Sequence, residues 1–139
     1  MPVIRKIVIL SALILSFTLT AYAETEEFVG KGEYFAEPTD SIQKANDMAL
    51  QEAVRRVSEQ AAVALKSRSE IIVNELTNDE VAMVTVSVIR IKDRKFNIDI
   101  TPNGVIKSTA TVIAEVDTDE AEDAAKKLLE EKVRNNERG

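Results

Sequence analysis

The stretch SIQKANDMALQEAVRRVSEQAAVALK, residues 41–66, contains neither proline nor glycine and repeats its apolar residues with the period of a helix. Asp40 precedes it as a suitable N-cap, and Gln43 stands where a capping box needs its second member. The apolar face contains many small side chains, among them Ala45, Ala49 and Ala53. Small side chains let a helix lie close to a sheet. We therefore predict one long helix over residues 41–66 that covers a sheet.

The segment before this helix, Thr25–Phe35 (TEEFVGKGEYF), is predicted to be a strand. Phe28 and Tyr34 share one face of it with Gly30 and Gly32, because side chains alternate across a strand. Two glycines inside a strand indicate a bulge or the close approach of another element. The long helix is the expected neighbour.

Two short segments follow the long helix. Ser69–Asn74 (SEIIVN) is predicted to be a short strand. Thr77 and Glu80 have the spacing of a capping box, which predicts a helix through about Val88. The β-branched residues near its end favour a strand instead. Residues 78–88 are therefore predicted to be helical, with a strand as the alternative.

Residues Ile89–Thr101 and Val105–Asp117 alternate apolar and polar side chains and are predicted to form a long β-hairpin. On its first strand the apolar side chains of Phe96, Ile98 and Ile100 alternate with polar ones. Pro102 and Gly104 supply the turn between the two strands, with proline at its second position and glycine closing it.

A last helix is predicted after the hairpin. Asp117 or Thr118 is its expected N-cap, and acidic residues fill its first turns, where the helix dipole favours them. The predicted order is β-α-β-(α)-β-β-α. It indicates an α+β fold in which a single, mainly antiparallel sheet is covered on one face by the long helix. Residues 24–135 are expected to form one domain, and residues 136–139 to fray.

The first 23 residues have the three-part pattern of a secretory signal peptide. Arg5 and Lys6 precede an apolar run of 13 residues, Ile7–Leu19, and Ala21 and Ala23 stand where signal peptidase reads small side chains. Cleavage before Glu24 is therefore expected, and the mature protein is predicted to be periplasmic or secreted. The run is shorter than the roughly 20 residues that span a bilayer, and an uncleaved membrane anchor is the alternative.

Composition restricts the chemistry of the mature chain. The sequence contains no cysteine and no histidine, which excludes disulfides, Ser-His-Asp and Cys-His catalysis and a lipid-bearing cysteine. Without Arg5 and Lys6, 16 of the 18 basic residues remain against 24 acidic ones, a net charge of −8. Such a surface disfavours nucleic acid and gives no reason to bind anionic lipid. Membrane contact is expected only through an uncleaved leader.

Three local motifs are interpreted as structural or solvated. Gly30-Lys31-Gly32 lies inside a strand and lacks the longer glycine-rich turn of a P-loop. Asp117, Asp119 and Asp123 lack the remaining ligands of an EF-hand and suit helix capping. The hairpin residues Lys92, Arg94 and Lys95 form a basic spot, either a solvated edge that blocks pairing or a site for an acidic partner. No cofactor or metal site is predicted.

Taken together, the Phe28–Gly32 run, the alanine-lined helix, the hairpin and the Val116–Asp119 run resemble a family of small exported bacterial domains. That family is similar to the twenty-kilodalton envelope lipoproteins and to the N-terminal domain of flagellar assembly protein T. The resemblance covers about residues 26–120. It implies an α/β fold and an envelope role, with no catalytic residues to carry over, and membrane anchoring does not transfer because the lipidated cysteine is missing.

The predicted function is that of a non-catalytic envelope binding or assembly module, not an enzyme. Its expected partner is another protein or a second copy that pairs along the hairpin edge. A small carboxylate-dependent hydrolase is one alternative, since 24 acidic residues are available. A secreted inhibitor or stress-protective protein is the other.

Overall fold

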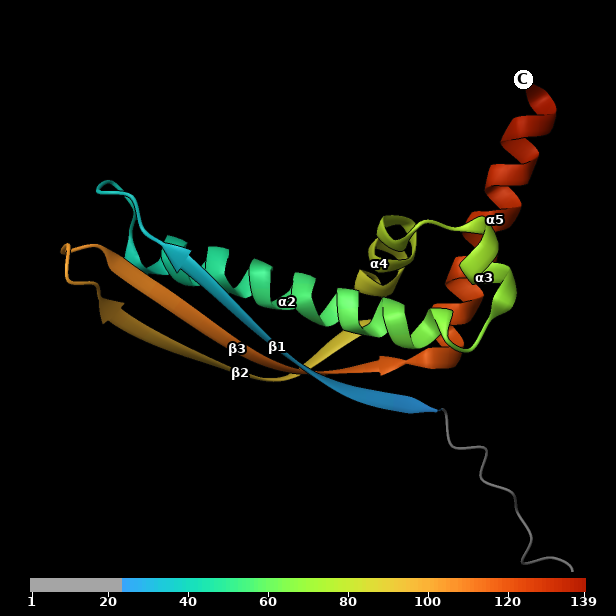
Figure 1. The fold of residues 1–139 in the computed structure, drawn as a ribbon. Coiled ribbons are helices and arrows are strands. Elements are labelled where there is room, and N and C mark those ends of the chain that lie inside the picture. The colour runs from blue at the N-terminus through green and yellow to red at the C-terminus, as the bar shows by residue number, and fades with distance from the viewer. Residues whose placement is uncertain (1–23) are drawn as a thin grey trace, which may run out of the picture.

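A three-stranded antiparallel sheet and four helices make up residues 24–139, the part of the chain that the computed structural model describes (Figure 1). The sheet has the order β1-β3-β2, with β1 at Thr25–Phe35, β2 at Ile89–Ile100 and β3 at Ile106–Asp117. The helices are α2 (Ile42–Lys66), α3 (Glu70–Glu75), α4 (Asn78–Val86) and α5 (Thr118–Arg138). The fold is α+β, as predicted. The predicted signal peptide, with Ala21 and Ala23, lies outside the described residues.

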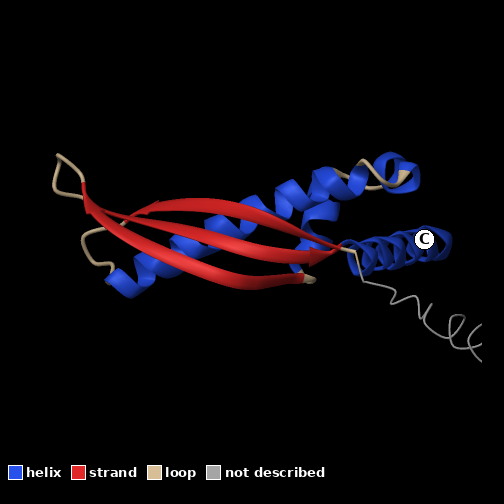
Figure 2. Cartoon of the chain, turned by 90° about the horizontal axis from the view of Figure 1, so that it is seen from below, coloured by secondary structure: helices blue, strands red, loops and turns tan. Residues whose placement is uncertain are grey.

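The long helix α2 covers one face of the sheet, as predicted, and Figure 2 shows it crossing behind the strands. Its alanines, Ala45, Ala49 and Ala53, are completely buried. The two strand glycines allow this contact. A Cβ atom on Gly30 would lie 2.7 Å from Cγ2 of Val57, and one on Gly32 would lie 2.9 Å from the carbonyl carbon of Glu52. Both atoms would lie even closer to other backbone atoms of α2, so the prediction of close approach is confirmed.

The three shorter helices, α3, α4 and α5, gather around the C-terminal end of α2 (Figure 1). There Ile72 of α3, Val81 of α4 and Ala121 of α5 join one buried apolar cluster with Leu65 of α2. A second cluster lies under the middle of α2 and consists of small residues from α2 and β3. The core is therefore thin along the sheet and broad at one end.

The prediction of a strand at Ser69–Asn74 is wrong, because these residues form α3 and its N-cap. The Ile72 N–H donates to the Ser69 hydroxyl at 3.5 Å, and Ile72 is completely buried while Ile71 is exposed. A short apolar pair suits a strand or one turn of helix equally well. Here the neighbours of the segment are helices, and its backbone satisfies its own hydrogen bonds. The order is therefore β-α-α-α-β-β-α.

The helical prediction for residues 78–88 is confirmed for α4, which ends at Val86. Thr77 and Glu80 form the predicted capping box, with the Glu80 N–H donating to the Thr77 hydroxyl at 3.2 Å and the Thr77 N–H donating to the Glu80 carboxylate at 2.8 Å. The β-branched Thr85 is accommodated because its hydroxyl donates to the Val81 carbonyl at 2.7 Å.

The N-cap of α2 is Ser41 and not Asp40, so that prediction is wrong by one residue. The Lys44 N–H donates to the Ser41 hydroxyl at 3.1 Å. Asp40 instead accepts hydrogen bonds from the Glu37 N–H at 2.9 Å and the Tyr34 hydroxyl at 2.8 Å. Its carboxylate therefore bonds to the connector, to β1 and to the Lys44 ammonium of α2, and not to a backbone N–H of the helix.

The predicted hairpin turn and last helix are both present. Gly104 has φ 79°, a conformation that favours glycine, and its N–H donates to the Thr101 carbonyl at 2.9 Å across Pro102. Asp117 is the N-cap of α5 and accepts from the Glu120 N–H at 3.0 Å. The helix α5 runs to Arg138, so most of the tail predicted to fray is helical.

Candidate functional site

The strand β2 lies at the edge of the sheet and outside the cover of α2. Alternate residues of β3 are completely buried, whereas no residue of β2 is. Phe96 and Ile98 are paired in register with Ala110 and Ser108 of β3, whose side chains face α2. Ser108 shows this directly, since its hydroxyl donates to the Asn46 side chain of α2 at 2.7 Å.

Three apolar side chains of β2 therefore lie on the helix-covered face of the sheet but beyond the helix. Their exposed fractions are 39% for Phe96, 38% for Ile98 and 73% for Ile100. We call these three residues the β2 apolar row. Apolar side chains on this face are buried under α2 in the neighbouring strand, so the row is a continuation of the core surface that residues 24–139 leave partly exposed.

The backbone of the β2 apolar row also points outward. The Thr101 N–H donates to the Val105 carbonyl at 2.8 Å, and the Ala36 N–H donates to the Ile106 carbonyl, also at 2.8 Å. The backbone of Ile106 therefore bonds to β1. Its partner in β2, Ile100, receives no backbone hydrogen bond from it. Because antiparallel hydrogen bonds alternate along a strand, the N–H and C=O groups of the row face the open edge.

The other edge of the sheet is better protected. On β1, the side-chain amide of Gln60, from α2, donates to the Val29 carbonyl at 2.9 Å. The inner face of β1 lies directly under α2, where the close glycine contacts leave no room. The two edges therefore differ on the helix-covered face, which α2 fills over β1 and which carries the exposed apolar row on β2.

A bulge bounds the accessible part of β2. The register of β2 shifts between Ile91 and Asp93, which leaves Lys92 as the extra residue. The ammonium of Lys92 lies 2.9 Å from the Glu115 carboxylate and 3.9 Å from that of Glu27. The hydrogen bond to Glu115 raises the pKa of Lys92. The predicted basic spot is thus partly neutralised by acids of the domain itself.

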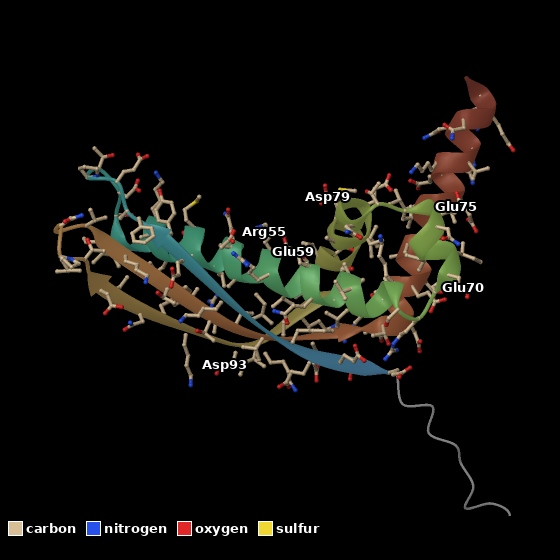
Figure 3. The ribbon with its side chains drawn as sticks, viewed as in Figure 1. Arg55, Glu59, Glu70, Glu75, Asp79 and Asp93 are labelled. Atoms are coloured by element: carbon tan, nitrogen blue, oxygen red, sulfur yellow. The ribbon has the colours of Figure 1, made fainter. Side chains whose placement is uncertain are left out.

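A separate cleft of about 410 Å³ lies between α2 and α4. Figure 3 shows Arg55 and Glu59 of α2 on the same side of the molecule as Asp79 of α4. Arg55 forms ion pairs with Glu52 and Glu59, and its hydrogen bonds hold the pKa of Glu52 down to about 2. The Ser58 hydroxyl donates to the Arg55 carbonyl at 2.7 Å. Arg55, Glu59 and Ser58 of this cleft are therefore already bonded to other groups of α2.

The predicted site residues do not converge on one place. Gly30, Gly32 and the three alanines of α2 form the helix–sheet contact, and Pro102 and Gly104 form the hairpin tip. Thr77, Glu80 and Asp117 cap helices at the other end. Glu24, the first described residue, accepts from the Thr118 hydroxyl at 2.7 Å and lies 3.2 Å from the Arg68 guanidinium. These residues shape the domain and line no common pocket.

The exposed β2 apolar row is the feature that the sequence did not identify. The sequence shows its alternation, but alternation also describes a strand whose apolar face is covered. Among residues 24–139 no cluster of three or more acidic side chains is placed to hold a metal ion. In the same range no helix is both long and apolar enough to cross a membrane.

No protein-family model matches this chain, and no curated protein is detectably similar to it. The resemblance to exported envelope domains therefore remains a prediction.

Proposed function

We propose that the mature chain is a non-catalytic binding or assembly module of the cell envelope, periplasmic or secreted, and that it acts through the open edge of β2. The observation that carries this proposal is the β2 apolar row together with its outward-facing backbone. Natural sheets normally protect their edges with charges, short strands or a covering element. On β2 the bulge and the basic residues lie at residues 92–95, and the apolar row that follows them is uncovered. Residues 96–100 are therefore suited to receive a partner strand.

The location rests on the signal-peptide pattern of residues 1–23. A supporting observation is that Glu24, the residue that cleavage after Ala23 would leave first, is itself bonded to the domain. Its carbonyl accepts from both the N–H and the hydroxyl of Thr118, at 3.0 Å and 2.7 Å. N-terminal sequencing of the protein from an extracytoplasmic fraction is expected to begin at Glu24. A sequence beginning at Met1, or recovery from the cytoplasm alone, contradicts this part of the proposal.

A cross-linking experiment in cells tests the binding role. A photoreactive amino acid replaces Ile98 in the β2 apolar row, and in a matched control it replaces Ile71 of α3, which is 58% exposed. We expect a discrete covalent adduct from position 98 and none from position 71. Equal yields from both positions, or none from either, contradict a binding role for the β2 edge.

A further inference from the structure

We propose that the partner of the β2 edge is a second copy of this chain, paired antiparallel through β2 about a two-fold axis at Asn97. The inference rests on the proposed function and names its partner. The two sheets then join into one sheet of six strands, with both α2 helices on the same face. The argument depends on register, because only some registers bring complementary side chains together.

Two constraints limit the register. Directly opposed residues of antiparallel strands project from the same face, so the two-fold axis has to pass through a residue position and not between two of them. The backbone groups that face the open edge belong to the β2 apolar row, and each strand therefore bonds to its copy through that row. The bulge at Lys92 ends the pairing segment, which leaves residues 94–100.

An axis at Asn97 produces two kinds of favourable pair, each occurring twice. On the helix-covered face Phe96 lies opposite Ile98 of the second copy, an aromatic–β-branched pair of the kind that stabilises sheets. On the other face Lys95 lies opposite Asp99 of the second copy, a pair of opposite charges. Asn97 faces its own copy, and an amide side chain both donates and accepts hydrogen bonds.

Neighbouring registers lose these pairs. With the axis at Phe96, Lys95 lies opposite Asn97, and Asp99 has no opposite residue within 94–100, so no ion pair forms. With the axis at Lys95, that residue lies opposite its own copy. With the axis at Ile98, Lys95 lies opposite Thr101 and no ion pair forms. The sequence of β2 is therefore self-complementary in one register.

The charge of the domain also favours this contact. The mature chain has a net charge of −8, so two copies repel each other in most orientations. Residues 94–100 carry two positive charges, from Arg94 and Lys95, and one negative charge, from Asp99. The surface as a whole is acidic, but the β2 edge has no local excess of negative charge. Two copies can therefore approach each other there.

A single cysteine at position 97 tests the geometry directly, since the wild-type chain has no cysteine. At the axis the two Cα atoms would lie about 4.5 Å apart, within the range that a disulfide bridges. We expect purified N97C to form a disulfide-linked dimer under mild oxidation. The matched control is N103C, an exposed asparagine of the hairpin turn that the axis does not bring near its copy, and it is expected to stay monomeric.

Charge reversal tests the register in the otherwise unmodified protein. K95D and D99K each place like charges opposite one another, and each is expected to weaken dimerisation by roughly tenfold or more in sedimentation equilibrium. The double variant K95D/D99K restores opposite charges and is expected to recover the dimer. Circular dichroism of all three checks that the monomer fold is intact.

The outcomes separate this inference from the proposed function. If N97C stays monomeric while position 98 cross-links to a different protein, the second copy is wrong as the partner and the binding role stands. If position 98 cross-links to nothing, both fail. If the double variant remains as weak as the single ones, the register at Asn97 is wrong.

Discussion

Gly32 and Gly30 are required by the distance between α2 and β1. A Cβ atom on Gly32 would overlap backbone atoms of α2, the Ala49 oxygen and the Ala53 nitrogen, and a backbone cannot move aside as a side chain can. The two glycines therefore determine how deeply the helix sits on the sheet. Their role is steric, and their backbone angles lie in the ordinary strand region.

Replacing Gly32 with alanine is expected to destabilise the domain by about 1–3 kcal/mol or more, as overpacked cores do. Lys31→Ala, at the exposed position between the glycines, is the control and is expected to change stability by less than about 0.5 kcal/mol. Urea unfolding followed by circular dichroism measures both. Equal stability of Gly32→Ala and the wild type would rule out the close contact.

Asp40 is held ionised by three hydrogen bonds. The Lys44 ammonium, first, and then the Glu37 N–H and the Tyr34 hydroxyl lower the pKa of Asp40 from 3.8 to about 2. A carboxyl whose pKa is lower in the folded state contributes stability above its unfolded pKa. That contribution is lost as the pH falls through the folded pKa. The stabilisation from Asp40 is therefore complete above about pH 4 and disappears toward pH 2.

The variant that tests this contribution of Asp40 is Asp40→Asn, whose side chain cannot ionise. We expect the difference in melting temperature between wild type and Asp40→Asn to be largest near neutral pH and to shrink between pH 4 and pH 2. Asp47→Asn, an exposed position on the same helix, is the control. A difference that stays constant over this pH range would contradict the role of Asp40.

At the scale of the elements, α3 shows how tertiary surroundings select between two local structures. Its apolar pair, Ile71 and Ile72, suits a strand or a helical turn. In the structure Ile72 enters the cluster formed by α2, α4 and α5, while Ile71 remains 58% exposed. The segment lies at the broad end of the core, away from both edges of the sheet (Figure 1), so no strand was available to pair with it.

The two isoleucines form a matched pair for mutation. Ile72→Ala is expected to cost about 2–5 kcal/mol, because it removes a completely buried side chain and leaves a cavity. Ile71→Ala is expected to cost less than about 1 kcal/mol, since little of its side chain is removed from water. Chemical denaturation of both variants measures the difference. The reverse order would show that α3 is oriented differently.

At the scale of the whole molecule, the width of α2 explains the open edge. A helix with its side chains is about 10–12 Å wide, and strands lie about 4.8 Å apart. One helix therefore covers about two strands, and here these are β1 and β3. The third strand, β2, keeps its apolar row exposed. Because each α2 helix leaves the β2 apolar row uncovered, pairing two sheets at β2 brings the two uncovered rows together.

Amide hydrogen exchange is expected to report this arrangement along β2. In dilute, monomeric protein the amides of Phe96, Ile98 and Ile100 should exchange rapidly, and those of Lys95, Asn97 and Asp99 slowly, because only the latter bond to β3. At concentrations where the dimer forms, the Phe96 and Ile98 amides should become protected. Slow exchange of both sets in the monomer would contradict the open edge.

Much of this fold follows from short-range patterns. The helical period over residues 41–66, the capping box at Thr77, the alternation of the hairpin and the Pro102–Gly104 turn each involve residues close in sequence. The stability of these local structures depends on neighbours within a few positions. They can therefore be predicted without knowledge of the tertiary contacts. The two strand glycines also pointed correctly to a close helix, because glycine inside a strand otherwise only weakens it.

Other features depended on which elements meet. The choice of helix for α3 and the lack of a cover over β2 each depend on elements distant in sequence. The apolar alternation of β2 is the same whether a helix covers it or not. Only the strand order β1-β3-β2, with one helix wide enough for two strands, left that row exposed and created the candidate interface.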